Sequence, residues 1–133
     1  MPCVRENMEK QLAPEVLVVE DQPLTRMAAA DAITDLGAKV QEAGDAGEAL
    51  NLLSQHPQVG LLFTDVDLPG DMNGLLLAEK VHSERPDVEL IVTSGHIQIA
   101  DKDLPDHGTF LPKPYRAERL QNLVKDKLRS RSG

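Results

Sequence analysis

The stretch GLLFTDVDLPG, residues 60–70, joins an apolar run to an acidic residue and then to a turn. An uninterrupted apolar run of this length is typical of a strand that is buried on both faces, as in a parallel sheet. Asp65 stands at the carboxyl end of the predicted strand, which is where open α/β sheets carry their reactive groups. The stretch therefore predicts a parallel α/β sheet with a carboxylate at its functional edge.

Short apolar runs alternate with helical patterns on both sides of this stretch. Strands are expected at residues 16–19, 39–43, 60–65, 89–93 and 109–111. A helical pattern follows each of them, although Pro105 and Gly108 shorten the one within residues 96–107. Because crossovers between parallel strands are right-handed, the alternation predicts an α/β fold with a doubly wound, five-stranded parallel sheet and five helices on its two faces.

Two of the predicted helices have recognisable beginnings. Asp21 is expected to cap the first helix, with Pro23 in its first turn and Gly37 beyond its end. The buried face of this helix is expected to consist of apolar residues at four-residue spacing, Leu24, Ala28, Ala32 and Leu36. Asp45 and Glu48 have the spacing of a capping box at the head of the second helix.

Length, charge and composition limit the classes of function. A chain of 133 residues is one ordinary domain, and we expect an N-terminal extension over residues 1–14, the domain over 15–130 and a tail over 131–133. The net charge of −8 argues against direct contact with duplex DNA, and 2% aromatic residues argue against stacking on single strands. No apolar run reaches the length of a membrane span, and Cys3 is the single cysteine, so a cytoplasmic protein is expected.

Charged and polar residues stand at the ends of three other predicted strands. Glu20 and Asp21 follow the first strand, Thr93 ends the fourth and Lys113 follows the fifth. Carboxylates held a few ångströms apart repel by roughly 4 kcal/mol per pair at an effective dielectric constant of about 20, so a cation is expected among them. Oxygen ligands suit Mg²⁺, and no His or Cys lies near these motifs in the sequence, which argues against zinc.

The same strand ends suit a phosphoryl group. The ammonium of Lys113 can balance its charge, the hydroxyl of Thr93 can donate to one of its oxygens, and Asp65 is the candidate nucleophile that would form an aspartyl phosphate. Taken singly, each of these residues has an ordinary role, because acidic residues cap helices and Lys-Pro forms turns at strand ends. Their joint occurrence at four strand ends favours the functional interpretation.

With these residues in place, the chain resembles the receiver domain of two-component response regulators over about residues 15–130. The matching positions are the acidic pair Glu20 and Asp21, the phosphoacceptor Asp65, the switch residues Thr93 and Phe110, and Lys113 followed by Pro114. The resemblance implies a flavodoxin-like fold with strand order 2-1-3-4-5 and a cis Lys113–Pro114 bond. It also implies that Mg²⁺ is held by Asp21, Asp65 and the backbone carbonyl of Asp67, with Glu20 helping through water.

The resemblance further implies the partners of the domain. A histidine kinase or a histidine phosphotransfer protein gives its phosphoryl group to Asp65, after which Thr93 moves toward that group and Phe110 turns inward. A downstream protein then reads the surface of the fourth helix, the fifth strand and the fifth helix. No direct contact with nucleic acid or membrane is expected. The chain is expected to be a monomer or a weak homodimer that catalyses only its own phosphorylation and dephosphorylation.

Three features depart from the pattern of the family. Residues 69–74, PGDMNG, make the loop after Asp65 one residue longer than usual, so the dephosphorylation rate and the choice of kinase are expected to differ from those of relatives. Asp67 adds an anion at a position where the side chain varies in the family and tunes the lifetime of the phosphoryl group. The segment of the fourth helix is short and contains Pro105, so the output face is not expected to move as it does in better-known members of the family.

Several alternatives stay open. Few residues follow the last predicted helix, which favours a stand-alone single-domain regulator over a receiver excised from a hybrid kinase or a multidomain regulator. Asp65-Val-Asp67 is also the first motif of haloacid-dehalogenase-like phosphatases, but the chain is short for that fold and the acidic pair precedes the nucleophile. A receiver fold that signals by binding alone and is never phosphorylated is the remaining alternative.

Overall fold

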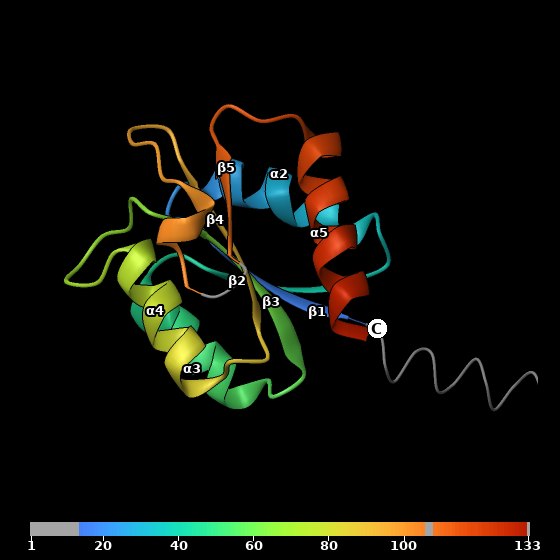
Figure 1. The fold of residues 1–133 in the computed structure, drawn as a ribbon, viewed down its shortest axis with the longest axis horizontal. Coiled ribbons are helices and arrows are strands. Elements are labelled where there is room, and N and C mark those ends of the chain that lie inside the picture. The colour runs from blue at the N-terminus through green and yellow to red at the C-terminus, as the bar shows by residue number, and fades with distance from the viewer. Residues whose placement is uncertain (1–13, 106–107, 133) are drawn as a thin grey trace, which may run out of the picture.

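The structure, a computed structural model, describes residues 14–105 and 108–132. A parallel sheet of five strands lies between two layers of helices, in the strand order β2-β1-β3-β4-β5 (Figure 1). The strands are β1 (Glu15–Val19), β2 (Lys39–Ala43), β3 (Val59–Asp65), β4 (Glu89–Ser94) and β5 (Thr109–Pro112). The predicted fold class and strand order are confirmed. Residues 1–13 of the expected extension and residue 133 of the expected tail lie outside the described residues.

The two faces of the sheet follow from the alternation of side chains along the strands. Helices α2 (Pro23–Thr34) and α5 (Ala117–Ser132) pack on the face that carries Val16 and Val18. Helices α3 (Ala46–Gln55) and α4 (Gly74–Glu84) pack on the face that carries Leu17 and Val19. Every residue of β1 and β3 is buried, as expected for central strands covered on both faces, whereas the edge strand β2 is mostly half-buried or exposed.

The segment between β4 and β5 differs from the prediction of a fifth helix. The described part of this segment contains only a single 3₁₀ turn, η1 (Asp101–Asp103), so the described residues form four α-helices. Pro105 disfavours a helical conformation in the residue before it, and Leu104 is indeed extended, with φ −94° and ψ 159°. The carboxylate of Asp101 accepts a hydrogen bond from the backbone N–H of Phe110 at 2.8 Å. The segment therefore runs beside the edge of β5 instead of coiling.

The beginning of α2 also differs from the prediction. Gln22, not Asp21, is the N-cap residue, and no side chain caps the helix, although Pro23 does begin it. Leu24 is 82% exposed, and the buried residues Ala29, Ala30, Ala32 and Ile33 all lie in the second half of the helix. The four-residue spacing was wrong for the first two turns, because Leu24 and Ala28 line an open groove between α2 and α5 and stay exposed. Gly37 follows the helix with a φ of +89°, which glycine adopts without strain.

The helices on the other face begin as the sequence indicates. The carboxylate of Asp45 accepts from the N–H of Glu48 at 2.8 Å, which confirms the predicted N-cap of α3. Asn73 caps α4 in the same way, accepting from the N–H of Leu76 at 2.9 Å. The N–H of Gly74 donates to the carbonyl of Val66 at 2.9 Å, and a Cβ at this position would collide with the backbone carbonyl of Asp65. The loop after β3 therefore returns to the strand end from which it departs.

Candidate functional site

Three charged side chains from distant parts of the chain meet at the carboxyl edge of the sheet. Glu20 follows β1, Asp65 ends β3 and Lys113 follows β5. The Nζ atom of Lys113 lies 2.9 Å from Oδ2 of Asp65 and 2.9 Å from Oε2 of Glu20. The backbone N–H of Lys113 donates to the carbonyl of Ser94 at 3.0 Å, which fixes the end of β5 beside that of β4. The structure thus brings together side chains that are 93 and 48 residues apart.

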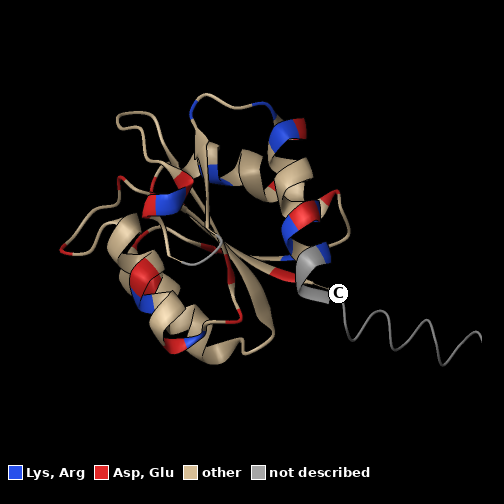
Figure 2. Cartoon of the chain, in the orientation of Figure 1, with Lys and Arg blue, Asp and Glu red and all other residues tan. Residues whose placement is uncertain are grey.

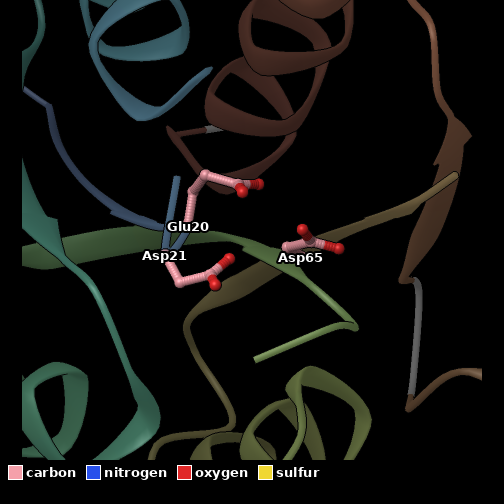
Figure 3. Close-up of side chains that lie close together, drawn as sticks. All are labelled: Glu20, Asp21 and Asp65. Atoms are coloured by element: carbon pink, nitrogen blue, oxygen red, sulfur yellow. The ribbon is translucent and has the colours of Figure 1, made fainter. Parts of the chain in front are cut away.

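The acidic pair and Asp65 form a cluster of possible metal ligands. One carboxylate oxygen from each of Glu20, Asp21 and Asp65 lies within 4.8 Å of the others. Figure 3 shows the three carboxylates gathered from two segments of the chain, with Glu20 and Asp21 on neighbouring positions and Asp65 beside them. Glu20 and Asp65 are buried and Asp21 is exposed, so the cluster opens to solvent on one side. A set of oxygen donors with this negative charge suits a divalent cation such as Mg²⁺.

The electrostatics of the cluster are set by burial and by mutual contacts. Burial raises the pKa of the Glu20 carboxyl above its usual 4.5, and the neighbouring Asp65 raises it further, while Lys113 lowers it in part. Burial by itself lowers the pKa of the Lys113 ammonium, but its bonds to Glu20 and Asp65 outweigh this effect and raise its pKa above 10.5. The ammonium is therefore charged at neutral pH, and it is shared between two carboxylates.

Thr93 carries a buried hydroxyl beside this cluster. It pairs with Asp65 in the register of β3 and β4 and is only 1% exposed. Among the described residues, its Oγ1 has no hydrogen-bond partner. A buried hydroxyl without a partner costs free energy, so this position is prepared to donate to a group that arrives at the strand ends.

Two further positions named by the resemblance lie on β5 and immediately after it. The ring of Phe110 is buried against the core beneath α3 and α4, so the aromatic side chain already points inward in this structure. The Lys113–Pro114 peptide bond is cis, as the resemblance implied. The switch role of Phe110 and the metal role of the Asp67 carbonyl stay predictions.

A cleft of about 300 Å³ opens over the cluster, and it contains residues that the sequence analysis did not single out. Its walls are formed by Asp21, Gln22, Asp65, Asp67, Gly95, His96 and Lys113. The inference that no histidine lies near the site was wrong, because His96 lines the cleft although it belongs to no metal-ligand motif. It reaches this place because the loop after β4 passes over the end of its own strand. A histidine three residues beyond Thr93 was the signal available in the sequence.

Asp67 contacts the site through its backbone as well as lining the cleft. Its N–H donates to Oδ1 of Asp65 at 3.1 Å. Its side-chain Oδ2 accepts a hydrogen bond from the hydroxyl of Ser94 at 3.3 Å. The oxygens of Asp65 are thus held from two sides, by this N–H and by the ammonium of Lys113.

A larger and mostly apolar groove of about 650 Å³ lies between α2 and α5. Leu24, Ala28 and Tyr115 are among its lining residues, and Lys113 and Gly95 belong to its wall as well as to that of the cleft. Among the described residues no carboxylate lines this groove, which distinguishes it from the acidic cleft.

The fold and the chemistry of this edge define a class of signalling domains: a flavodoxin-like sheet that gathers an acidic pair, an aspartate and a lysine. The chain belongs to the response regulator receiver family, because the family model of the response regulator receiver domain matches residues 16–125. The sensor protein TorS of Escherichia coli is 31% identical over 114 residues, which cover 82% of this chain and 12% of that protein. The chemotaxis protein CheY homolog of Campylobacter jejuni is 30% identical over 125 residues, covering 90% of this chain and 95% of that one.

Solved structures agree with this placement. The receiver domain of the hybrid histidine kinase CckA superposes with a TM-score of 0.74 at 31% identity, covering 86% of this chain and 98% of that one. Several of the curated relatives are much longer than this chain, which spans 12% of TorS and 45% of the aerobic respiration control protein ArcA of Escherichia coli. The family model and this solved receiver domain agree, and the phosphatase alternative is set aside.

The charge distribution outside the site is mixed. Figure 2 shows basic and acidic positions close together along the backbone of α5. Exposed residues of this helix include Arg119, Lys125 and Arg129 together with Glu118 and Asp126. In the part of the chain that the structure describes, none of the helices is long and apolar enough to cross a membrane.

Proposed function

We propose that the chain accepts a phosphoryl group on Asp65 from a histidine kinase or a histidine phosphotransfer protein. The observation that carries the proposal is the pairing of Asp65 with the ammonium of Lys113, next to the hydroxyl of Thr93, which has no partner among the described residues. A carboxylate of Asp65 attacks the phosphorus of the donor's phosphohistidine. The P–N bond breaks, its electron pair stays with the imidazole, and an aspartyl phosphate forms.

The residues around Asp65 have separate parts in this step. The ammonium of Lys113 compensates the charge of the transferred group, and the hydroxyl of Thr93 donates to one of its oxygens. The N–H of Asp67 holds the acceptor carboxylate in place. Asp21, Asp65 and the backbone carbonyl of Asp67 are the proposed ligands of Mg²⁺, with Glu20 acting through water, and Mg²⁺ supplies charge neutralisation for the phosphoryl oxygens when it is bound.

The surface near the cleft supports a protein as phosphodonor. Leu24 and Met27 are large apolar side chains exposed on α2. The apolar groove begins beside them and shares Lys113 with the cleft. Exposed apolar area next to a reactive site is typical of a surface that another protein covers during function.

The proposal extends to the bounds of the domain, its output surface and its setting. The match of the family model to residues 16–125 supports a domain over 15–130. The face formed by η1, β5 and α5 is the proposed surface for a downstream protein, and the chain is proposed to act as a monomer or weak homodimer in the cytoplasm. The nearly full-length match to the CheY homolog supports a stand-alone regulator, while the match to part of TorS supports a receiver within a longer kinase.

Labelling with a small phosphodonor tests the proposal. We expect acetyl phosphate with Mg²⁺ to give an acid-stable, hydroxylamine-sensitive adduct on the wild-type chain, and Asp65→Asn to lower its yield by at least about 100-fold. Asp31→Asn, an exposed position on α2, is the matched control and should label normally. Persistent labelling of Asp65→Asn would contradict the site. An unlabelled but folded wild-type chain would favour a receiver that signals by binding alone.

A further inference from the structure

Ser94, the last residue of β4, is a buried residue that the proposed function does not use. Its hydroxyl is only 1% exposed and makes three hydrogen bonds. It donates to Oδ2 of Asp67 at 3.3 Å and accepts from the N–H groups of His96 at 3.1 Å and Ile97 at 3.3 Å. A serine hydroxyl has one donor and two acceptor positions, so its whole hydrogen-bonding capacity is in use.

The contrast with the residue before it is informative. The hydroxyl of Thr93 has no partner among the described residues, whereas that of Ser94 has every partner it can hold. The backbone carbonyl of Ser94 also accepts a hydrogen bond from the backbone N–H of Lys113. One residue therefore connects the loop after β3, the loop after β4 and the end of β5, which together form three walls of the cleft.

Asp67 is the partner whose charge matters most. It lines the cleft with Asp21 and Asp65, and its own N–H contacts Oδ1 of Asp65. In the described part of the chain, Ser94 is the one residue that donates a hydrogen bond to the Asp67 carboxylate. Without this bond an exposed carboxylate would be free to turn toward a cluster that already holds three others.

We propose that Ser94 is a positioning residue, which holds the Asp67 carboxylate on the β4 side of the cleft and out of the cation cluster. The inference rests on the proposed function, since it concerns how Asp65 is reached. A released Asp67 would add a fourth oxygen ligand and strengthen cation binding. The same negative charge would oppose the approach of an anionic phosphodonor. Ser94 thus keeps the cleft open to phosphoryl groups at the expense of cation affinity.

A double-mutant cycle tests this role. We expect Ser94→Ala to tighten Mg²⁺ binding, measured by calorimetry, and to slow labelling by acetyl phosphate, each by about tenfold. In the Asp67→Asn background, where the charge is absent, the same Ser94→Ala substitution should change neither quantity. Equal effects of Ser94→Ala in both backgrounds would reduce Ser94 to a structural residue, and no effect in the wild-type background would overturn the inference.

Two controls distinguish a failure of the inference about Ser94 from a failure of the proposed function: a serine substitution far from the cleft and the wild-type chain. Ser54→Ala removes an exposed hydroxyl that binds the carbonyl of Asn51 on α3, far from the cleft, and should leave both measurements unchanged. Thermal unfolding of each variant establishes that it is folded. If the wild-type chain is not labelled, the proposed function fails. If the wild-type chain is labelled and Ser94→Ala behaves like it in rate and Mg²⁺ affinity, only the inference about Ser94 fails.

Discussion

Strand β1 has a buried glutamate at each end, and the two glutamates have different surroundings. At the amino end, Oε2 of Glu15 lies 3.1 Å from Nδ1 of His56, and its Oε1 accepts from the side-chain amide of Gln58 at 3.3 Å. At the carboxyl end, Glu20 contacts Lys113 but must share it with Asp65. Glu15 thus has two neighbouring polar side chains that it does not share with the site, whereas Glu20 and Asp65 share the one ammonium of Lys113.

Other groups at the two ends of the sheet extend this contrast. Near Glu15, the guanidinium of Arg85 donates to the backbone carbonyls of Pro57 and Val59, each at 2.7 Å, so it holds the chain itself together. Near Glu20, Thr93 has a hydroxyl without a described partner, and Asp21 adds a further negative charge. Burial of a charged group therefore does not mark a functional site. Nor does a buried oxygen without a partner, because among the described residues Oε2 of Glu15 also lacks a hydrogen bond, although Nδ1 of His56 lies 3.1 Å away. The site is marked instead by three clustered carboxylates, two of which share one ammonium.

The largest effect is expected at Lys113. Lys113→Gln removes the ammonium that Glu20 and Asp65 share, so labelling of Asp65 by acetyl phosphate should slow by about 100-fold. The free energy of unfolding should fall by at most about 2 kcal/mol, because the side chain keeps some contact with water and two carboxylates lose a partner. Labelling rates and urea unfolding measure the two effects. Lost stability with normal labelling would place Lys113 among the structural charges.

An intermediate effect is expected at the opposite end of β1. Glu15→Gln should lower the free energy of unfolding by about 1–2 kcal/mol, because a buried carboxylate that contacts His56 and Gln58 is replaced by a neutral amide. Labelling of Asp65 should proceed at the wild-type rate, since no group of the cleft changes. Labelling rates and urea unfolding again measure the two effects. A slower labelling rate in this variant would break the distinction between the two ends of the sheet.

The smallest effect is a dependence of stability on pH through Glu20. Because burial, and then Asp65, raise the pKa of Glu20 in the folded chain above 4.5, the folded state binds this proton more tightly than the unfolded state. Its contribution to stability is complete below pH 4.5 and is lost as the pH rises through the folded pKa. Without divalent cations, Glu20→Gln should therefore gain stability relative to the wild type toward neutral pH. Urea unfolding at several pH values measures this difference. If the free energies of unfolding of the variant and the wild type changed with pH in parallel, the expectation would be contradicted.

Much of the fold could be predicted because central strands leave a strong pattern in the sequence. Burial on both faces requires apolar residues throughout β1 and β3, and such runs can be recognised without knowledge of their neighbours. The path between β4 and β5 depends instead on one tertiary contact, in which Asp101 binds the backbone of Phe110. The exposure of Leu24 likewise depends on the open groove between α2 and α5, which periodicity does not reveal.

Some residues of the site could likewise be predicted from the sequence, and others could not. Asp65, Glu20, Thr93 and Lys113 could be predicted as a group, because the carboxyl ends of parallel strands share one edge. The place of His96 and the hydrogen bonds of the Ser94 hydroxyl could not, since they depend on how the loop after β4 folds over its strand. A second hydroxyl directly after Thr93 at a strand end was the only sign of Ser94 in the sequence.

The close approach of Gly74 to Asp65 limits how the loop between them can change in evolution. Both ends of this loop are fastened to the end of β3, by the N–H of Asp67 at one end and by Gly74 at the other. Its tip, between these two anchors, is exposed at Pro69, Gly70 and Asp71. Insertions and substitutions at the tip can therefore diversify what an approaching protein meets, while the acceptor carboxylate keeps its position.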